Sequence, residues 1–194
     1  GTHAPFHRDF WNWYWPLLMA KRDGKRLVNL TEEVSGEIVQ VPLAYLLTLG
    51  RGMGKSTVCE WANVALGAIL GQTLSLYISS VQKLARGHLN NIREEIEDSL
   101  VTKYYPGLSN PEVGKFNNRY GWNQDLLATQ SGLTIFAIGL EEEVRGVKRR
   151  QLRPSLINLD EFDSKSDSPD VVKKKEAIIG GSIFGTQVED TLII

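Results

Sequence analysis

The chain has 194 residues, of which 42% are hydrophobic and 23% are charged, and its formal net charge is −1. A chain of this size and composition suits one globular domain with a substantial core, and its near-zero charge excludes a globally basic nucleic-acid-binding protein, so any contact with a polyanion has to be local. The single cysteine, Cys59, excludes an internal disulfide and favours a reducing compartment, and no apolar run approaches the length of a membrane span.

The first 42 residues are predicted to form an aromatic-rich helix followed by a polar connector. The helix covers 6–22, and we expect it to be interrupted or kinked at Pro16. Packing over a core is the simplest role for its aromatic side chains. Residues 23–42 contain Gly24, Gly36 and Pro42 and are typical of a connector. We therefore divide the chain into an N-terminal segment, 1–42, that packs on the core, and a core, 43–194.

The next part of the chain alternates between strand and helix patterns. Residues 43–49 form an apolar run ending in glycines, which is typical of a buried strand, and a second strand is predicted over 73–79. A helix is predicted over 55–70 and another over 81–100. The apolar face of the first helix comprises Val58, Trp61, Ala62, Ala65 and Leu66. The stripe along the second comprises Val81, Leu84, Ala85, His88, Ile92 and Ile96.

The remaining segments continue this alternation after a loop-like region at 102–122. Two strand patterns, 125–129 and 133–140, are joined through Ser131 and Gly132 and are compatible with a hairpin. A short strand at 156–159, a helix at 171–179 and a strand beginning at Thr191 follow. Strands that alternate with helices predict an α/β fold with a mostly parallel central sheet and helices on both faces.

The run LGRGMGKST, residues 49–57, is close to the phosphate-binding pattern G-x-x-x-x-G-K-[ST], with Leu49 in place of the first glycine. A predicted strand precedes it and a predicted helix follows, as a cradle of backbone N–H groups for phosphate requires. Lys55 is expected to reach the β- and γ-phosphates of a nucleotide, and the Ser56 hydroxyl to ligate Mg²⁺. The alternative is an ordinary glycine-rich turn. The predicted nucleotide-binding residues are Gly50, Arg51, Gly52, Met53, Gly54, Lys55, Ser56 and Thr57.

The segment LINLDE, residues 156–161, is an apolar strand that ends in two acids and has the form of a Walker B motif. Asp160 is expected to hold Mg²⁺ through water, and Glu161 to polarise the water that attacks the γ-phosphate. A solvated turn at a strand end is the alternative for the acids alone, but the upstream loop favours a nucleotide hydrolase. The acid after Asp160 and the lack of an N-K-x-D segment favour ATP over GTP.

These motifs resemble the large terminase subunits, the DNA-packaging motors of tailed bacteriophages, from about Leu43 to Asp163. The likeness includes the arginine early in the loop, the missing first glycine, and Ser79-Ser80 before a helix. It also includes VRG at 144–146 and RPSLINLDE at 153–161, which are similar to the family's R-G and R-P-D-L-I-I-x-D-[DE] segments. Ser155 and Asn158 depart from the commonest form of that pattern.

The resemblance implies an ATP-hydrolysing, RecA-like (ASCE) P-loop NTPase domain that uses Mg²⁺. It also implies a homo-oligomeric ring at the procapsid portal in the host cytoplasm, with no membrane, that translocates double-stranded DNA. The implied protein partners are a portal protein and a small terminase subunit. The family's nuclease domain is expected beyond Ile194, so the chain resembles an isolated motor domain.

Two arginines are candidates for stabilising charge on the transferred phosphoryl group. Arg145 is the candidate arginine finger, supplied to the active site of a neighbouring subunit; the alternative is a solvated member of the basic cluster that follows it. Arg51 either contacts phosphate or forms a surface ion pair. Glu161, Arg145 and Arg51 are thus the predicted catalytic residues, and Ser56 and Asp160 the predicted metal ligands.

Other readings of the same residues remain open. Residues 160–163, DEFD, match the D-E-x-D letters of a helicase, although such an enzyme needs a second RecA-like domain. A nucleotide-gated assembly module with little turnover would carry the same loop. We expect His88 to be a packed histidine rather than a ligand, and Cys59 to be a small core residue.

Overall fold

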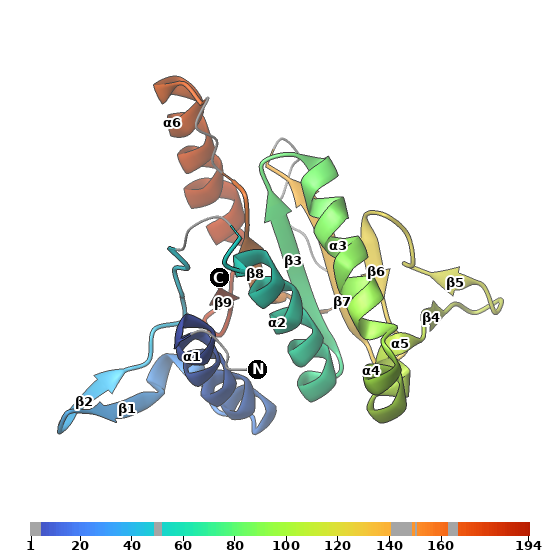
Figure 1. The fold of residues 1–194 in the computed structure, drawn as a ribbon, viewed down its shortest axis with the longest axis horizontal. Coiled ribbons are helices and arrows are strands. Elements are labelled where there is room, and N and C mark those ends of the chain that lie inside the picture. The colour runs from blue at the N-terminus through green and yellow to red at the C-terminus, as the bar shows by residue number, and fades with distance from the viewer. Residues whose placement is uncertain (1–4, 49–51, 141–148, 150, 163–166) are drawn as a thin grey trace.

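The computed structural model describes residues 5–48, 52–140, 149, 151–162 and 167–194, and within them the fold is α/β. A five-stranded mixed sheet has the order β6-β7-β3-β8-β9 (Figure 1). All neighbours pair in parallel except β6 and β7, which form an antiparallel hairpin. In sheet order, the strands span Leu126–Ala128, Leu133–Gly139, Thr73–Ser79, Pro154–Leu159 and Leu192–Ile193.

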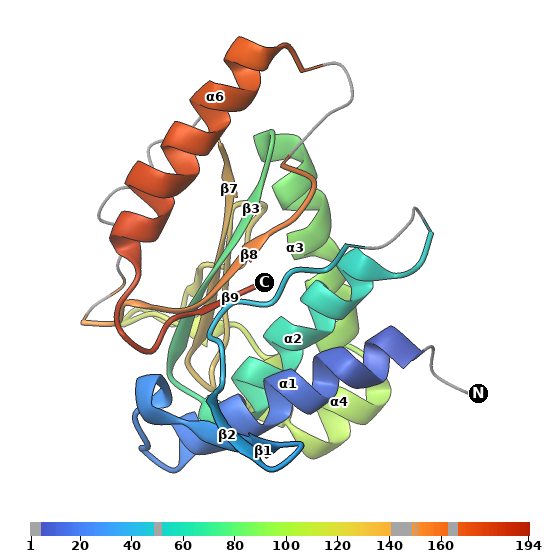
Figure 2. The same ribbon diagram turned by 90° about the vertical axis from the view of Figure 1, so that its left-hand side faces the viewer.

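Helices cover both faces of this sheet, as the sequence predicted (Figure 2). On one face lie α1 (Pro5–Arg22), α2 (Lys55–Leu70) and α3 (Gln82–Ile96). On the other lies α6 (Pro169–Ile178), which continues through η2 (Ile179–Ile183) and η3 (Phe184–Thr186). A strand covered on both faces has no solvent-facing side, which explains why all seven residues of β3 are buried.

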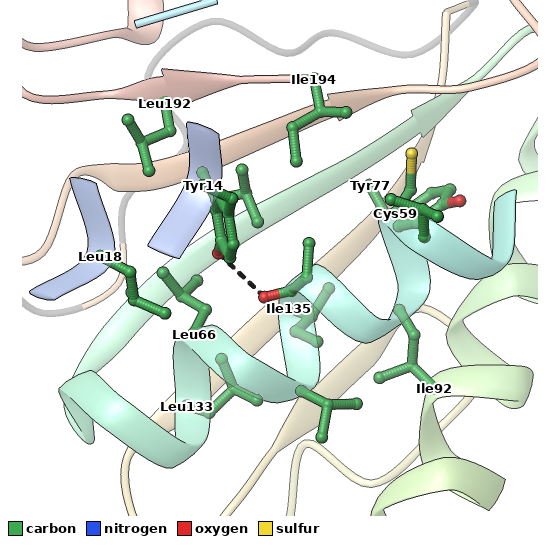
Figure 3. Packing of buried hydrophobic residues seen from close by; sticks show 14 of the residues in the cluster. Tyr14, Leu18, Cys59, Leu66, Tyr77, Ile92, Leu133, Ile135, Leu192 and Ile194 are labelled. Carbon is green, nitrogen blue, oxygen red and sulfur yellow. Dashed lines mark hydrogen bonds between the residues drawn. The ribbon is translucent and has the colours of Figure 1, made fainter. Parts of the chain in front are cut away.

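The N-terminal helix is joined to the core by aromatic packing and by buried hydrogen bonds. The ring of Tyr14 is fully buried, and its hydroxyl donates to the carbonyl of Ala62 on α2 over 2.9 Å (Figure 3). Trp13 Nε1 donates to the carbonyl of Pro42 over 2.7 Å. Pro16 lies inside a continuous helix, so the predicted interruption is wrong. Tertiary packing of the aromatic face offsets the backbone hydrogen bond that a proline cannot make.

The predicted first strand of the core pairs only briefly. Ala44 forms an isolated parallel bridge with Ile193, in which Tyr45 N donates to the Ile193 carbonyl and Ile193 N to the Leu43 carbonyl, each over 2.9 Å. The segment that enters the glycine-rich loop therefore runs beside β9. As a result, β9 lies between this segment and β8, the strand that ends in the two acids.

Most other predicted elements are confirmed, and the differences are local. The connector at 23–42 and the loop-like region at 102–122 each contain a short hairpin that the sequence did not indicate. The predicted helix at 81–100 is divided into α3 and a second helix, α4. Trp61, Val81 and Leu84 were expected in the core but are exposed, while Leu89 is buried instead. The smaller elements are η1 (Leu27–Asn29), β1 (Thr31–Val34), β2 (Glu37–Gln40), α4 (Ser99–Tyr104), α5 (Pro106–Ser109), β4 (Glu112–Val113) and β5 (Arg119–Tyr120).

Candidate functional site: a helix N-terminus facing two acids

The described end of the glycine-rich loop leads directly into α2. Gly52 and Gly54 adopt left-handed backbone conformations, with φ of 76° and 77°. Residues with a side chain rarely adopt this conformation, so the two glycines allow the tight curvature of the loop. Gly54 is the N-cap of α2, and no side chain caps the helix. The first N–H groups of α2 thus lack intrahelical acceptors and form a site suited to an anion.

Gly54 also lies close to the N-terminal helix. A Cβ atom built on Gly54 would lie 3.3 Å from Nε2 of His7, which belongs to the first turn of α1. The ring of Phe6 meets that of His7 edge-on, with centroids 4.1 Å apart. The start of α1 therefore packs beside the loop, while the residues further along the helix pack into the core.

The two acids follow β8 at the carboxyl edge of the sheet. Asp160 is buried; its backbone N–H donates to the Ile78 carbonyl on β3 over 3.0 Å, and its carboxylate Oδ2 accepts from the Tyr77 hydroxyl over 2.9 Å. Glu161 adopts a left-handed conformation with φ of 51°, and its carbonyl accepts from Ser80 N over 3.2 Å. The change of backbone conformation leaves the Glu161 side chain half-exposed while Asp160 stays inside.

The loop, the start of α2 and both acids line one cleft of about 710 Å³. That volume lies within the usual range for small-molecule sites. Ligands of open α/β sheets bind outside the carboxyl ends of the strands, which is where this cleft lies. The residues that line it are Gly52, Met53, Gly54, Lys55, Ser56, Thr57, Ser80, Leu84, Asp160 and Glu161. A separate hollow of about 550 Å³ at the sheet edge has Glu189 as its one ionisable lining residue.

Behind the acids lies a buried polar network that the sequence analysis missed. The ring of His88 stacks on Tyr77, with centroids 4.8 Å apart. Its Nδ1 lies 2.8 Å from Oε1 of the buried Glu60, while its Nε2 lies 3.7 Å from Asp160 Oδ2 and 4.0 Å from Glu161 Oε2. The expectation that His88 is packed holds, but its outer nitrogen also faces the site.

The surroundings of this network shift several pKa values. Burial alone would lower the pKa of His88, but its hydrogen bond with Glu60 and the charges of Asp160, Glu60 and Glu161 outweigh this and raise it. Burial, together with the charge of Asp160 and the hydrogen bond to it, raises the pKa of Tyr77, so its hydroxyl stays protonated and can donate. Burial likewise raises the pKa of Cys59, which makes it an unreactive core thiol.

Two observations bear on whether the site fits a nucleotide and a magnesium ion. The helix N-terminus supplies N–H donors, and Lys55 lines the same cleft, which suits phosphate oxygens. The described residues contain no group of three or more His, Cys, Asp or Glu side chains that could hold a metal on their own. Mg²⁺ commonly takes one or two protein ligands and completes its shell with phosphates and water. Ser56 and Asp160 suit that arrangement.

The predicted site residues fall into two groups. From Gly52 to Thr57, together with Asp160 and Glu161, the structure brings the predicted residues to one cleft. Gly50, Arg51 and Arg145 lie outside the described residues. The sequence analysis missed Glu60 and Tyr77, whose signals in the sequence are weak, and it expected His88 only as a packed residue. Glu60 follows Ser56 by one helical turn, and Tyr77 lies near the carboxyl end of the strand beside β8.

A scan against protein-family models finds no match for this chain, and comparisons with curated proteins and with solved structures find none either. No helix in the described ranges combines the length and apolar character needed to cross a bilayer.

Proposed function

We propose that this chain is a Mg²⁺-dependent ATPase with a RecA-like (ASCE) P-loop fold. The observation that carries the proposal is the meeting, in one cleft, of the uncapped N-terminus of α2, Lys55 and Ser56 with Asp160 and Glu161. These elements come from distant parts of the chain, and a chance glycine-rich turn has no reason to face two acids from another strand. The position of β9 between the loop-bearing segment and β8 is compatible with the RecA-like class.

The residues divide the work of hydrolysis between them. The N–H groups at the start of α2 and the Lys55 ammonium bind and orient the phosphates, while Ser56 and Asp160 are the residues that would hold Mg²⁺. The ion would neutralise charge that develops on the phosphate oxygens. Glu161, exposed to the cleft, accepts a hydrogen bond from the attacking water and aligns it with the γ-phosphate.

We further propose that the ATPase is the motor domain of a large terminase subunit. On this reading it acts as a homo-oligomeric ring at a viral portal and drives double-stranded DNA into a procapsid. The support is the sequence likeness at 51–56, 144–146 and 153–161 together with an α/β fold that can carry it. The portal protein and a small terminase subunit are the corresponding proposed partners.

The test of the ATPase proposal compares Lys55→Ala with Lys174→Ala, a change of an exposed lysine on α6. Binding of Mg-ATP and release of phosphate are measured for both variants and for the parent chain. We expect Lys55→Ala to abolish turnover and weaken binding, because it removes a charge from the phosphate site, and Lys174→Ala to behave like the parent. Near-normal turnover in Lys55→Ala would overturn the proposal, and binding without turnover in the parent would favour an assembly module.

A further inference from the structure

His88 on α3 links a buried carboxylate to the two acids of the cleft. One ring nitrogen, Nδ1, lies 2.8 Å from Glu60 Oε1. The other, Nε2, faces Asp160 Oδ2 at 3.7 Å and Glu161 Oε2 at 4.0 Å. The three acids come from α2 and from the end of β8, so a single side chain bridges elements that the fold brings together.

The ring is fixed on two sides. An ionised carboxylate can only accept hydrogen bonds, so the Glu60 contact assigns a proton to Nδ1. Glu60 is 4% exposed, and the same oxygen also accepts from Asn91 Nδ2 over 2.8 Å. The ring face is held by Tyr77, at an interplanar angle of 24°. A flip of the imidazole would break the Glu60 bond, so Nε2 is held toward the cleft.

Glu161, by contrast, has a fixed main chain and a side chain that is free to rotate. Its backbone has φ of 51°, a conformation that costs a residue with a side chain about 1 kcal/mol or more. The bond from Ser80 N to its carbonyl holds the main chain, while the carboxylate is half-exposed. Rotation about its own side-chain bonds can therefore bring the carboxylate from ion-pair distance to hydrogen-bond distance of Nε2. Asp160 already has its own donor, the Tyr77 hydroxyl.

We propose that His88, held by Glu60, is a positioning residue for Glu161, whose carboxylate it restrains in the orientation that polarises the attacking water. The inference rests on the proposed ATPase function and adds Glu60 and His88 to its machinery. Tyr77 and His88 then divide the task, since Tyr77 orients the acid that would hold the metal and His88 orients the acid that activates water. Residues of this supporting kind commonly change activity by about 10- to 100-fold when altered.

The kinetic test pairs His88→Gln with Asn91→Ala. An amide at position 88 cannot stack on Tyr77, bind Glu60 and reach Glu161 together, so we expect kcat to fall about 10- to 100-fold with KM for ATP nearly unchanged. Asn91→Ala removes the other donor to the same Glu60 oxygen but leaves the His88 ring between Glu60 and Glu161, so its kcat should stay close to that of the parent. Equal kcat in the parent and in His88→Gln, or an equal loss in both variants, would overturn the proposal.

A double-mutant cycle tests whether the effect passes through Glu161. In a Glu161→Gln background, adding His88→Gln should cost little further rate, because the group that His88 positions is already gone. Fully multiplicative losses would contradict the proposal. This cycle separates an action on Glu161 from a general effect on the fold, which would persist in either background.

A spectroscopic measurement distinguishes this inference from the ATPase proposal itself. The chain has three histidines, so the ring ¹⁵N signals of His88 are assigned by their loss in His88→Gln. Glu161→Gln should shift the Nε2 signal of His88, and the distant Lys174→Ala should not, whether or not the protein turns over ATP. An unchanged Nε2 signal in Glu161→Gln overturns the inference, whereas an absence of turnover in the parent overturns only the proposed function.

Discussion

Asp160 and Glu161 are neighbours in the chain, yet their side chains meet different surroundings. Asp160 is buried against Tyr77, and Glu161 turns out into the cleft through its left-handed backbone conformation. A buried, hydrogen-bonded carboxylate is suited to a fixed role such as holding a metal ion. An exposed carboxylate beside the same cleft can contact a water molecule that has to come and go. The geometry thus gives a physical reason for assigning the two roles in this order.

Glu161→Gln tests that assignment. The amide keeps the size of the side chain but is a much weaker base, so we expect Mg-ATP to bind nearly as tightly as in the parent while turnover falls about 100-fold or more. Binding is measured by calorimetry and turnover by phosphate release, with Lys174→Ala as the control. Loss of binding in Glu161→Gln would mean that Glu161 is a metal ligand or a structural residue.

Glu95 gives the stability of the protein a defined dependence on pH. Burial, followed by the charge of Glu60, raises its pKa from 4.5 to about 8, and its Oε2 is buried without a hydrogen-bond partner among the described residues. Between these two pH values the folded protein holds a proton that the unfolded chain has released. The stability contributed by this group is therefore full below about pH 4.5 and is lost as the pH rises toward 8.

We expect Glu95→Gln to remove this dependence. The free energy of unfolding of the parent should fall relative to that of Glu95→Gln as the pH rises from 5 to 8, by at most about 1.4 kcal/mol per pH unit. Urea unfolding of both proteins at several pH values measures the difference. Glu94→Gln alters the exposed neighbouring glutamate and should leave the slope unchanged. Parallel curves for Glu95→Gln and the parent would show that Glu95 is ionised in the folded state.

Site residues could be predicted from the sequence where they belong to one contiguous motif. They could not be predicted where only tertiary contacts bring them to the site. The loop glycines, Lys55 and Ser56 form a contiguous pattern from which a phosphate-binding loop can be predicted without a structure. Glu60 and His88 are far apart in the chain, and only the packing of α2 against α3 brings them together. Because one sequence contains no record of such contacts, the stripe on 81–100 indicated a packed His88 but gave no partner for it.

At the scale of elements, the amphipathic helices were found because burial of one face imposes a period on the sequence, and the central strand was found although both of its faces are buried. The prediction of 73–79 matches β3, and that of 55–70 matches α2. The β1–β2 hairpin was missed because 31–33 of β1 and all of β2 are exposed, with no alternation between buried and exposed positions to reveal them. The buried face of α3 consists of Ala85, Leu89, Ile92 and Ile96, so the predicted stripe is wrong at Val81 and Leu84, which are exposed. Leu84 lines the cleft instead of the core.

The approach of α2 to the hairpin formed by β6 and β7 depends on Gly67. A Cβ atom there would lie 2.6 Å from Leu133 Cδ2 and 2.7 Å from Leu108 Cδ1, and both leucines are buried. These side chains have little room to move, so Gly67→Ala is expected to destabilise the fold by about 1–3 kcal/mol despite the better helix propensity of alanine.

Gly87 on α3 is the matched control, because a Cβ atom there meets nothing within 4 Å. Gly87→Ala should stabilise the protein by up to about 1 kcal/mol through helix propensity alone. Thermal and urea unfolding of both variants measure the contrast. If Gly67→Ala were stabilised as much as Gly87→Ala, the close packing of α2 on Leu108 and Leu133 would not be present in solution.

At the scale of the whole molecule, the parallel sheet determines where the chemistry can occur. The strands β3, β8 and β9 run the same way, and the segment from 43 to 45 is parallel to β9, so the loop and the acids emerge at one edge. Since β7 and β8 both run parallel to β3, the chain must return from the carboxyl edge to the amino edge between Gly139 and Pro154. That stretch of the sequence contains Arg145 and the basic cluster formed by Lys148, Arg149, Arg150 and Arg153.

Arg149, the member of this cluster that the structure describes in most detail, is engaged within its own subunit. Its guanidinium stacks on Tyr120 at 4.8 Å, bonds Thr134 Oγ1 over 2.5 Å and pairs with Glu112. A guanidinium held in this way is unsuited to cross an interface. Arg149 is therefore set aside as an arginine finger, while the role expected for Arg145, which lies outside the described residues, stays a prediction.

Arg145 is predicted to act as an arginine finger between the subunits of an assembly. A finger stabilises charge in the transition state and gives about 10³ to 10⁵ in rate, so Arg145→Ala should bind ATP normally but hydrolyse it poorly. Turnover per molecule of the parent should also rise with protein concentration if, as proposed, the arginine comes from a neighbouring subunit. Mixing Arg145→Ala with Glu161→Gln should restore part of the activity, since an interface between them joins the intact site of one chain to the intact arginine of the other.

The control mixture is Lys55→Ala with Glu161→Gln, in which neither chain has a working site, so no activity should return. Two affinity tags, one on each chain, establish that mixed assemblies form. If they form and the Arg145→Ala mixture stays inactive, the arginine does not act between subunits. Arg51, in the loop proposed to bind the phosphates, then becomes the candidate for the same charge-stabilising role. In that case Arg51→Ala should lower turnover independently of protein concentration, because an arginine of the loop would serve the active site of its own chain.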